Sequence, residues 1–130
     1  MKRLVCAAVA LMLGAGAAMA ADPLEGMWRT AADDNGHSGL IQVAPCGDKL
    51  CGVLVKAYDS AGKQIQSANI GRKIISETVN NGNGKYSGKV YSPDRNKTYK
   101  SRLEMSGSTL NVQGCVMGIC RNGGTWKKVQ

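Results

Sequence analysis

Short runs of alternating hydrophobic and polar residues follow one another along the chain, and after residue 20 no stretch keeps a helical period over three turns. Gly, Asn, Asp, Ser and Pro separate the runs, as they do in hairpin turns. The pattern predicts eight β-strands, at 25–31, 38–45, 51–57, 72–79, 85–92, 97–105, 108–116 and 122–129. The segment 58–71 is left open between a long loop and a short helix.

Alternation also assigns the two faces of each strand. In the strand 97–105, Tyr99 and Leu103 belong to the interior set, whereas Lys100 and Arg102 belong to the solvated set. A sheet that is wet on one face and closed on the other fits a barrel, and short successive connections favour a meander. The sequence therefore predicts an all-β fold, a small eight-stranded antiparallel up-and-down barrel, with a two-sheet β-sandwich as the alternative.

The N-terminus reads as a secretory signal peptide. Lys2 and Arg3 precede an apolar run from Leu4 to Ala18, and small residues precede a break after Ala20. The run is too short to span a bilayer comfortably, and no later stretch is a candidate membrane span. The prediction is a signal peptide over 1–20 and a single barrel domain over 21–130, in the periplasm or secreted.

Four cysteines remain once Cys6 leaves with the signal peptide, and they form two Cys-x4-Cys pairs. In a short exported chain such pairs predict disulfides, with a structural zinc site as the competing interpretation. In the meander the two pairs fall at opposite ends of the barrel, beyond the ~6 Å that a disulfide allows between Cα atoms. Local pairing is therefore predicted, Cys46 with Cys51 and Cys115 with Cys120.

Positive charge exceeds negative charge. The formal net charge is +8, and it falls to +6 when Lys2 and Arg3 leave. Such an excess attracts anionic partners at low salt, although it also serves solubility. Aromatic residues do not interleave with the basic ones, which argues against nucleic acid as a partner.

The sequence offers no clear catalytic constellation. His37 is the only histidine, and its neighbours Asp33, Asp34, Asn35 and Gly36 are typical of a solvated turn. No nucleophile and base can be paired, and no cofactor motif is present. We therefore expect a protein that is not an enzyme and that uses no cofactor or metal.

Several motifs carry a resemblance to known families. Gly26-Met27-Trp28 resembles the Gly-x-Trp of lipocalin-type barrels. A wider set of segments resembles bacterial domain-of-unknown-function family 2147: Pro45–Gly52, Gly88–Pro93, Lys97–Tyr99, Leu110–Cys115, Cys120–Arg121 and Trp126. The resemblance covers nearly all of the chain after residue 20. It implies an exported calycin-like, lipocalin-like barrel and no established activity.

The first and last strands are expected to close the barrel. If Trp28 faces inward, Trp126 should lie opposite or diagonal to it, within reach of cross-strand contact. Lys128 or Arg121 is expected to place a cation over an indole face, as the lipocalin resemblance implies.

The leading functional hypothesis is a binding module for one small apolar or amphipathic, lipid-like anionic molecule. The candidate ligand-binding residues are Trp28, Tyr86, Val90, Tyr99 and Leu103, with Arg95 and Arg121 at the mouth. The mouth is expected to be weakly basic, with Lys63, Arg72, Lys73, Arg95, Lys97 and Arg121 against Asp33, Asp34, Asp59 and Asp94. Eight strands also permit a barrel filled by its own side chains. The alternative function is a cell-envelope protein-interaction module that acts through its surface.

Overall fold

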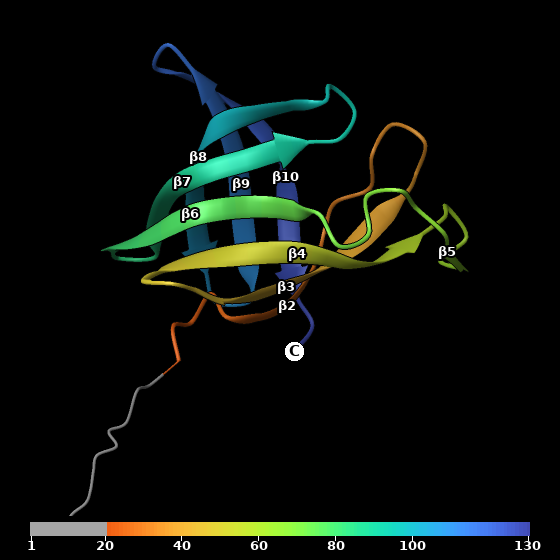
Figure 1. The fold of residues 1–130 in the computed structure, drawn as a ribbon, viewed down its shortest axis with the longest axis horizontal. Helices are drawn as coiled ribbons and strands as arrows, with labels where there is room; N and C mark the ends of the chain where they lie inside the picture. Colours follow the sequence, from red (N-terminus) through yellow and green to blue (C-terminus); the bar gives the residue numbers. More distant parts are fainter. Residues whose placement is uncertain (1–20) are drawn as a thin grey trace, which may run out of the picture.

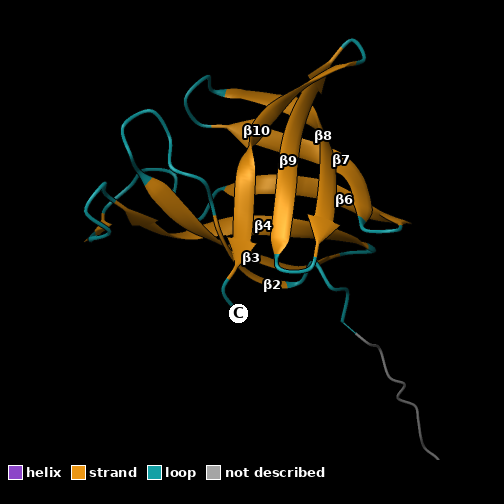
Figure 2. Ribbon diagram, turned by 180° about the vertical axis from the view of Figure 1, so that it is seen from behind, coloured by secondary structure: helices purple, strands orange, loops and turns teal. Residues whose placement is uncertain are grey.

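The computed structural model describes residues 21–130 and contains strands and connecting loops (Figure 2). The signal peptide expected over 1–20 lies outside the described residues. Within the described chain, no helix is long and apolar enough to cross a membrane. The strands are β2 (Gly26–Arg29), β3 (Ser38–Cys46), β4 (Lys49–Tyr58), β5 (Gln64–Ile65), β6 (Lys73–Gly82), β7 (Lys85–Ser92), β8 (Lys97–Ser106), β9 (Thr109–Val116) and β10 (Ile119–Lys128).

Eight of these strands form one closed antiparallel barrel (Figure 1). From β6 to β10, strands that follow one another in sequence are paired. The circle is completed by the pairs β10–β2, β2–β3, β3–β4 and β4–β6. The predicted up-and-down barrel is confirmed, and the sandwich alternative is excluded because the sheet closes on itself. The connections after β2, β4, β7 and β9 lie at one end of the barrel, which we call the mouth end. The other end is the closed end.

The eight predicted strands are all present, and their boundaries move by a few residues. The undecided segment 58–71 is a loop rather than a helix, and it contains the two-residue strand β5. This strand pairs with the last residues of β4, Ala57 opposite Ile65 and Tyr58 opposite Gln64. The Asp59 carboxylate accepts two main-chain hydrogen bonds within the loop, which fix the turn before β5.

The predicted faces of the strand 97–105 are confirmed in β8. Ser101 and Leu103 are buried, whereas Lys100, Arg102 and Glu104 are exposed. Alternation is interrupted in β6, where Glu77 has a positive φ of 49° and the register with β7 shifts. The interruption is a β-bulge, which bends a strand in a closed sheet.

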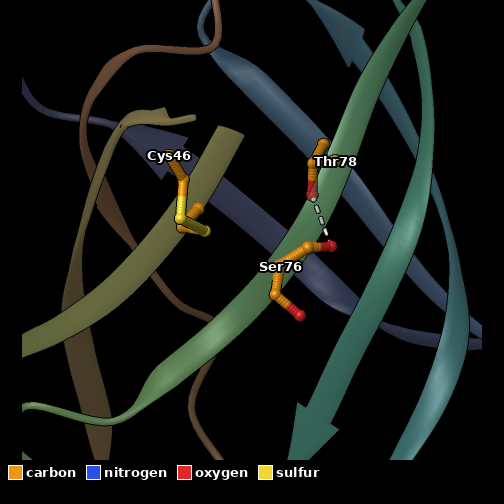
Figure 3. The surroundings of a disulfide bond; sticks show 4 residues. Cys46, Ser76 and Thr78 are labelled. Atoms are coloured by element: carbon orange, nitrogen blue, oxygen red, sulfur yellow. Dashed lines mark hydrogen bonds between the residues drawn. A yellow bond between two sulfur atoms is a disulfide. The ribbon is translucent and has the colours of Figure 1, made fainter. Parts of the chain in front are cut away.

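Both predicted disulfides are present. Cys46–Cys51 joins β3 and β4 at the closed end, with a Cα–Cα distance of 5.5 Å. Figure 3 shows it beside β6, where the Thr78 hydroxyl donates a 3.2 Å hydrogen bond to the Ser76 carbonyl. Cys115–Cys120 joins β9 and β10 near the mouth end. The two bonds lie at opposite ends, as the meander requires.

The two tryptophans lie diagonally across the seam between β2 and β10. Trp28 on β2 is paired with Lys128 on β10, and Trp126 lies two residues before Lys128 on the same strand. Both indoles are buried, and the Lys128 ammonium lies 5.6 Å from the centre of the Trp28 ring. The predicted closure is confirmed, and Lys128 rather than Arg121 supplies the cation.

The segment before β2 seals the closed end, which the alternation pattern does not predict. Leu24 is fully buried, and its carbonyl accepts a 2.8 Å hydrogen bond from Trp28 Nε1. The Lys128 ammonium donates to the Pro23 carbonyl at 2.7 Å. The residues that precede the first strand therefore form a plug at the closed end of the barrel.

A carboxylate anchors this plug to the barrel wall. Asp22 accepts hydrogen bonds from the Tyr86 hydroxyl at 2.6 Å, the Leu24 N–H at 2.8 Å and the Asn80 amide at 2.9 Å. Burial opposes ionisation of Asp22, but these hydrogen bonds outweigh it and hold the pKa of the carboxyl below its ordinary value. Burial, with the hydrogen bond to Asp22 and its charge, raises the pKa of Tyr86.

We predict that Trp28→Ala lowers the free energy of unfolding by about 3–5 kcal/mol, because it opens a cavity beneath the seam and leaves the Leu24 carbonyl unpaired. Urea denaturation followed by circular dichroism measures the change. A loss below about 1 kcal/mol would be typical of a surface position and would contradict the closure described above.

We predict that Tyr86→Phe lowers the free energy of unfolding by about 1–2 kcal/mol at neutral pH, because the ionised Asp22 loses its shortest hydrogen bond. Since the pKa of Asp22 is lowered by folding, its contribution is complete above the unfolded-state pKa. It is lost as pH falls through the folded-state pKa. The deficit of the variant should therefore shrink between about pH 7 and about pH 2. Denaturant titrations at the two pH values test this, and an equal deficit at both would refute it.

Candidate functional site

The half of the barrel toward the mouth end, which we call the upper half, contains a cavity of about 1100 Å³ that opens at the mouth end. The volume includes both the barrel interior and the space between the connections that surround the opening. The inner part of its wall is mainly apolar and comes from seven strands: Ile41, Leu54, Ala57, Ile74, Val90, Tyr99, Val112 and Trp126. The sequence predicted an apolar pocket at this end.

The half of the barrel toward the closed end, which we call the lower half, is filled by side chains. The fully buried residues Leu24, Trp28, Tyr86, Leu103 and Leu110 belong to the core cluster, and none of them lines the cavity. The boundary between the two halves is formed by residues that belong to the core cluster and also line the cavity: Ile41, Leu54, Ile74, Val112 and Trp126. The barrel is therefore neither wholly filled nor wholly hollow.

The predicted site residues fall on both sides of this boundary. Val90, Tyr99, Arg95 and Arg121 line the cavity. The other three, Trp28, Tyr86 and Leu103, pack in the filled half.

Small residues help to keep the upper half open. Gly114 lies on β9 opposite Arg121 and faces the cavity. A Cβ atom at Gly114 would lie 3.4 Å from the Cβ of Tyr99, an ordinary contact, so packing does not exclude a larger side chain here. Sequence reasoning missed Gly114, Val112 and Trp126 as cavity residues. The inward position of Gly114 on the mouth-side half of β9 would have identified it, whereas Val112 lies in the middle of β9 and Trp126 toward the closed end of β10, so their levels along the strands give no such signal.

The charges that line the mouth are balanced. Arg95, Lys97 and Arg121 supply three cations, and Asp33, Asp34 and Asp94 supply three carboxylates. The other expected cations, Lys63, Arg72 and Lys73, lie outside the lining.

Local hydrogen bonds hold two of the mouth connections in shape. The Asp33 carboxylate accepts hydrogen bonds from the main-chain N–H groups of Asn35 and His37, both at 2.9 Å. The Tyr91 hydroxyl donates to the Asn96 side chain at 2.7 Å, and the Arg72 guanidinium lies 4.6 Å from the centre of the Tyr91 ring. The Asp33 carboxylate is thus already engaged within its own turn.

The inner wall of the cavity offers mainly apolar contact, and most of the polar groups of the lining come from the connections at the mouth. His37 lies in the exposed turn after β2 and forms the rim of the cavity rather than its wall. In the part of the chain that the structure describes, no three His, Cys, Asp or Glu side chains are grouped in a way that could hold a metal ion.

Comparison with solved structures identifies a similar barrel. It is described as "Protein HP1028 from the human pathogen Helicobacter pylori belongs to the lipocalin family", with a TM-score of 0.63 and 18% sequence identity. The similarity covers 82% of this chain and 83% of that one, and at this identity it establishes a shared fold. No curated protein matches the sequence.

Comparison with family models agrees with the motifs in the sequence. Residues 26–128, which extend from β2 to the end of β10, match the model described as "Uncharacterized protein conserved in bacteria (DUF2147)". The matched range includes every strand of the barrel and both disulfides. The chain therefore belongs to the DUF2147 family.

Proposed function

We propose that this protein binds one small apolar or amphipathic molecule in the cavity at its mouth end and catalyses no reaction on it. The observation that carries the proposal is the division of the barrel into a filled lower half and a hollow upper half. Binding cavities for small molecules usually have volumes of about 300–1000 Å³, an apolar wall and a few polar groups at one end. The cavity of about 1100 Å³, part of which lies between the surrounding connections, slightly exceeds this range, and it has an apolar inner wall with polar groups at the mouth.

The lining indicates how the molecule lies. An apolar chain or ring would contact Val90, Tyr99, Val112 and Trp126, and a polar group would remain at the mouth. Within the balanced rim, Arg95, Lys97 and Arg121 form no ion pair in the described chain, so their charges are available to a ligand. We propose an anionic headgroup close to Arg95 and Arg121.

The place of action that we propose is outside the cytoplasm, in the periplasm or in the medium. The signal peptide predicted over residues 1–20 would direct export. The two disulfides support this assignment, because disulfides persist in oxidising compartments.

We predict that Gly114→Trp weakens the binding of a fluorescent fatty acid by at least about fivefold, because the new indole occupies space that the ligand needs. Fluorescence titration of the wild type and the variant gives both dissociation constants. Gln113→Trp is the matched control, since Gln113 is the neighbouring residue on β9 and its side chain is on the outer face. Equal affinity in the three proteins, or no binding to the wild type, would contradict the proposal.

We predict that the double variant Arg95→Glu with Arg121→Glu weakens fatty-acid binding about three- to tenfold at low salt. Two rim charges change sign, and added salt should reduce the effect because exposed charges are screened. The methyl ester of the same fatty acid is the control ligand, and its affinity should change much less. An equal loss for acid and ester would exclude recognition of an anionic headgroup.

A further inference from the structure

The β9–β10 hairpin projects beyond the neighbouring strands and ends in an exposed apolar turn (Figures 1 and 2). We call residues Val116–Ile119 the hairpin tip. The side chains of Val116, Met117 and Ile119 are 53%, 96% and 68% exposed. Half of the large hydrophobic residues that are exposed in the described chain lie in this single turn. Folding of the barrel gains little from the burial of these side chains.

Backbone geometry does not explain the methionine either. Met117 and Gly118 both have positive φ, 52° and 83°, in a two-residue turn. The turn between β6 and β7 has the same signs at Asn83 and Gly84, which is the Asn-Gly pair that such turns favour. A side chain like that of methionine is disfavoured at positive φ. The geometry of the turn therefore does not account for the presence of Met117.

Basic side chains outnumber acidic ones on the strands β8, β9 and β10. Residues 97–130 hold six Lys and Arg against one carboxylate, Glu104, which lies toward the closed end of β8. Lys100 is level with the Cys115–Cys120 disulfide, and Arg121 is one residue further down. Neither forms an ion pair in the described chain. At about 3.3 Å per residue, both lie about 7–10 Å below the turn.

We propose that the hairpin tip inserts into the surface of a lipid bilayer that contains anionic headgroups. Apolar elements that bind at a bilayer interface reach about 5–10 Å into it, and basic residues beside them contact the headgroups. With Met117 inserted, Lys100 and Arg121 are at the level of the phosphates. The disulfide below the tip keeps the two strands together, so the turn is presented as a preformed wedge.

The shape of the hairpin tip favours a lipid surface over a protein partner. A stable protein interface buries about 800 Å² on each partner, and it needs a broad complementary surface. The tip is a narrow, convex turn of four residues (Figure 2). The carboxylates Asp33, Asp34 and Asp94 line the same opening as the tip but belong to other connections, and none of them lies on β8, β9 or β10.

Docking of this kind would place the mouth of the cavity at the lipid surface, because Val116, Met117 and Ile119 also line the opening. The inference does not require the cavity to be occupied. A protein with an empty cavity would still insert its hairpin tip, so bilayer binding and ligand binding are separable by experiment.

Sedimentation with vesicles tests the inference. The wild type should bind vesicles of phosphatidylcholine with about 30% phosphatidylglycerol more tightly than pure phosphatidylcholine, and added salt should weaken binding. The variant Met117→Asn with Ile119→Ser should bind at least about tenfold less, because it removes the two most exposed apolar side chains. Asn-Gly suits the turn, so the variant should keep its thermal stability. Absence of wild-type binding, or equal binding by the variant, would overturn the inference.

Three control variants separate the hairpin tip from other features. Val129→Ser alters a residue at the other end of β10 that is also 53% exposed, and it should bind as the wild type does. Asn83→Met combined with Met117→Asn keeps the composition and moves the methionine to the matching turn at the closed end, and it should not restore binding. Gly114→Trp should bind vesicles normally while losing the fatty-acid probe. Loss of vesicle binding in Val129→Ser or Gly114→Trp, or its recovery in the exchange variant, would contradict docking through the tip.

Discussion

The barrel depends on a short seam. Two residue pairs join β10 to β2, Lys127 with Arg29 and Lys128 with Trp28. Main-chain hydrogen bonds between Met27 and residues 129–130 extend the seam, but the other neighbouring strands of the barrel share longer ladders. Side chains must therefore supply much of the cohesion at this point. The fully buried indole of Trp28 does so, with its hydrogen bond to Leu24 and the ammonium of Lys128 beside it. If this cluster were lost, the sheet would have two open edges.

Because the packed core is concentrated at the closed end, the barrel can remain open at the mouth end. The plug formed by Leu24 and anchored by Asp22 on Tyr86 concentrates the packed core in the lower half. The upper half then needs fewer contacts, and its strands can end in connections that surround an opening. The disulfide near the mouth end joins the two strands of the projecting β9–β10 hairpin. The packed core and the cavity thus lie at opposite ends of the same sheet.

Much of this fold could be predicted because its determinants are local. Alternation gives the strands, two-residue turns give antiparallel neighbours, and the resulting order places the two Cys-x4-Cys pairs at opposite ends. Alternation assigns a side chain to a face but not to a level along the barrel axis. Tyr86 was therefore grouped with Val90, although it lies one residue from the closed-end start of β7. The plug at Leu24 has no alternating pattern, so it could not be predicted at all.

The division of the barrel into a filled and a hollow half can be tested with the two tryptophans of the chain. Trp28 is in the filled half, and Trp126 lines the cavity. In an NMR spectrum of ¹⁵N-labelled protein each indole N–H gives one signal, and a medium-chain fatty acid can be titrated into the sample. The Trp126 signal should shift progressively and saturate, while the Trp28 signal stays in place. Equal shifts of both signals, or no shift of either, would contradict the account.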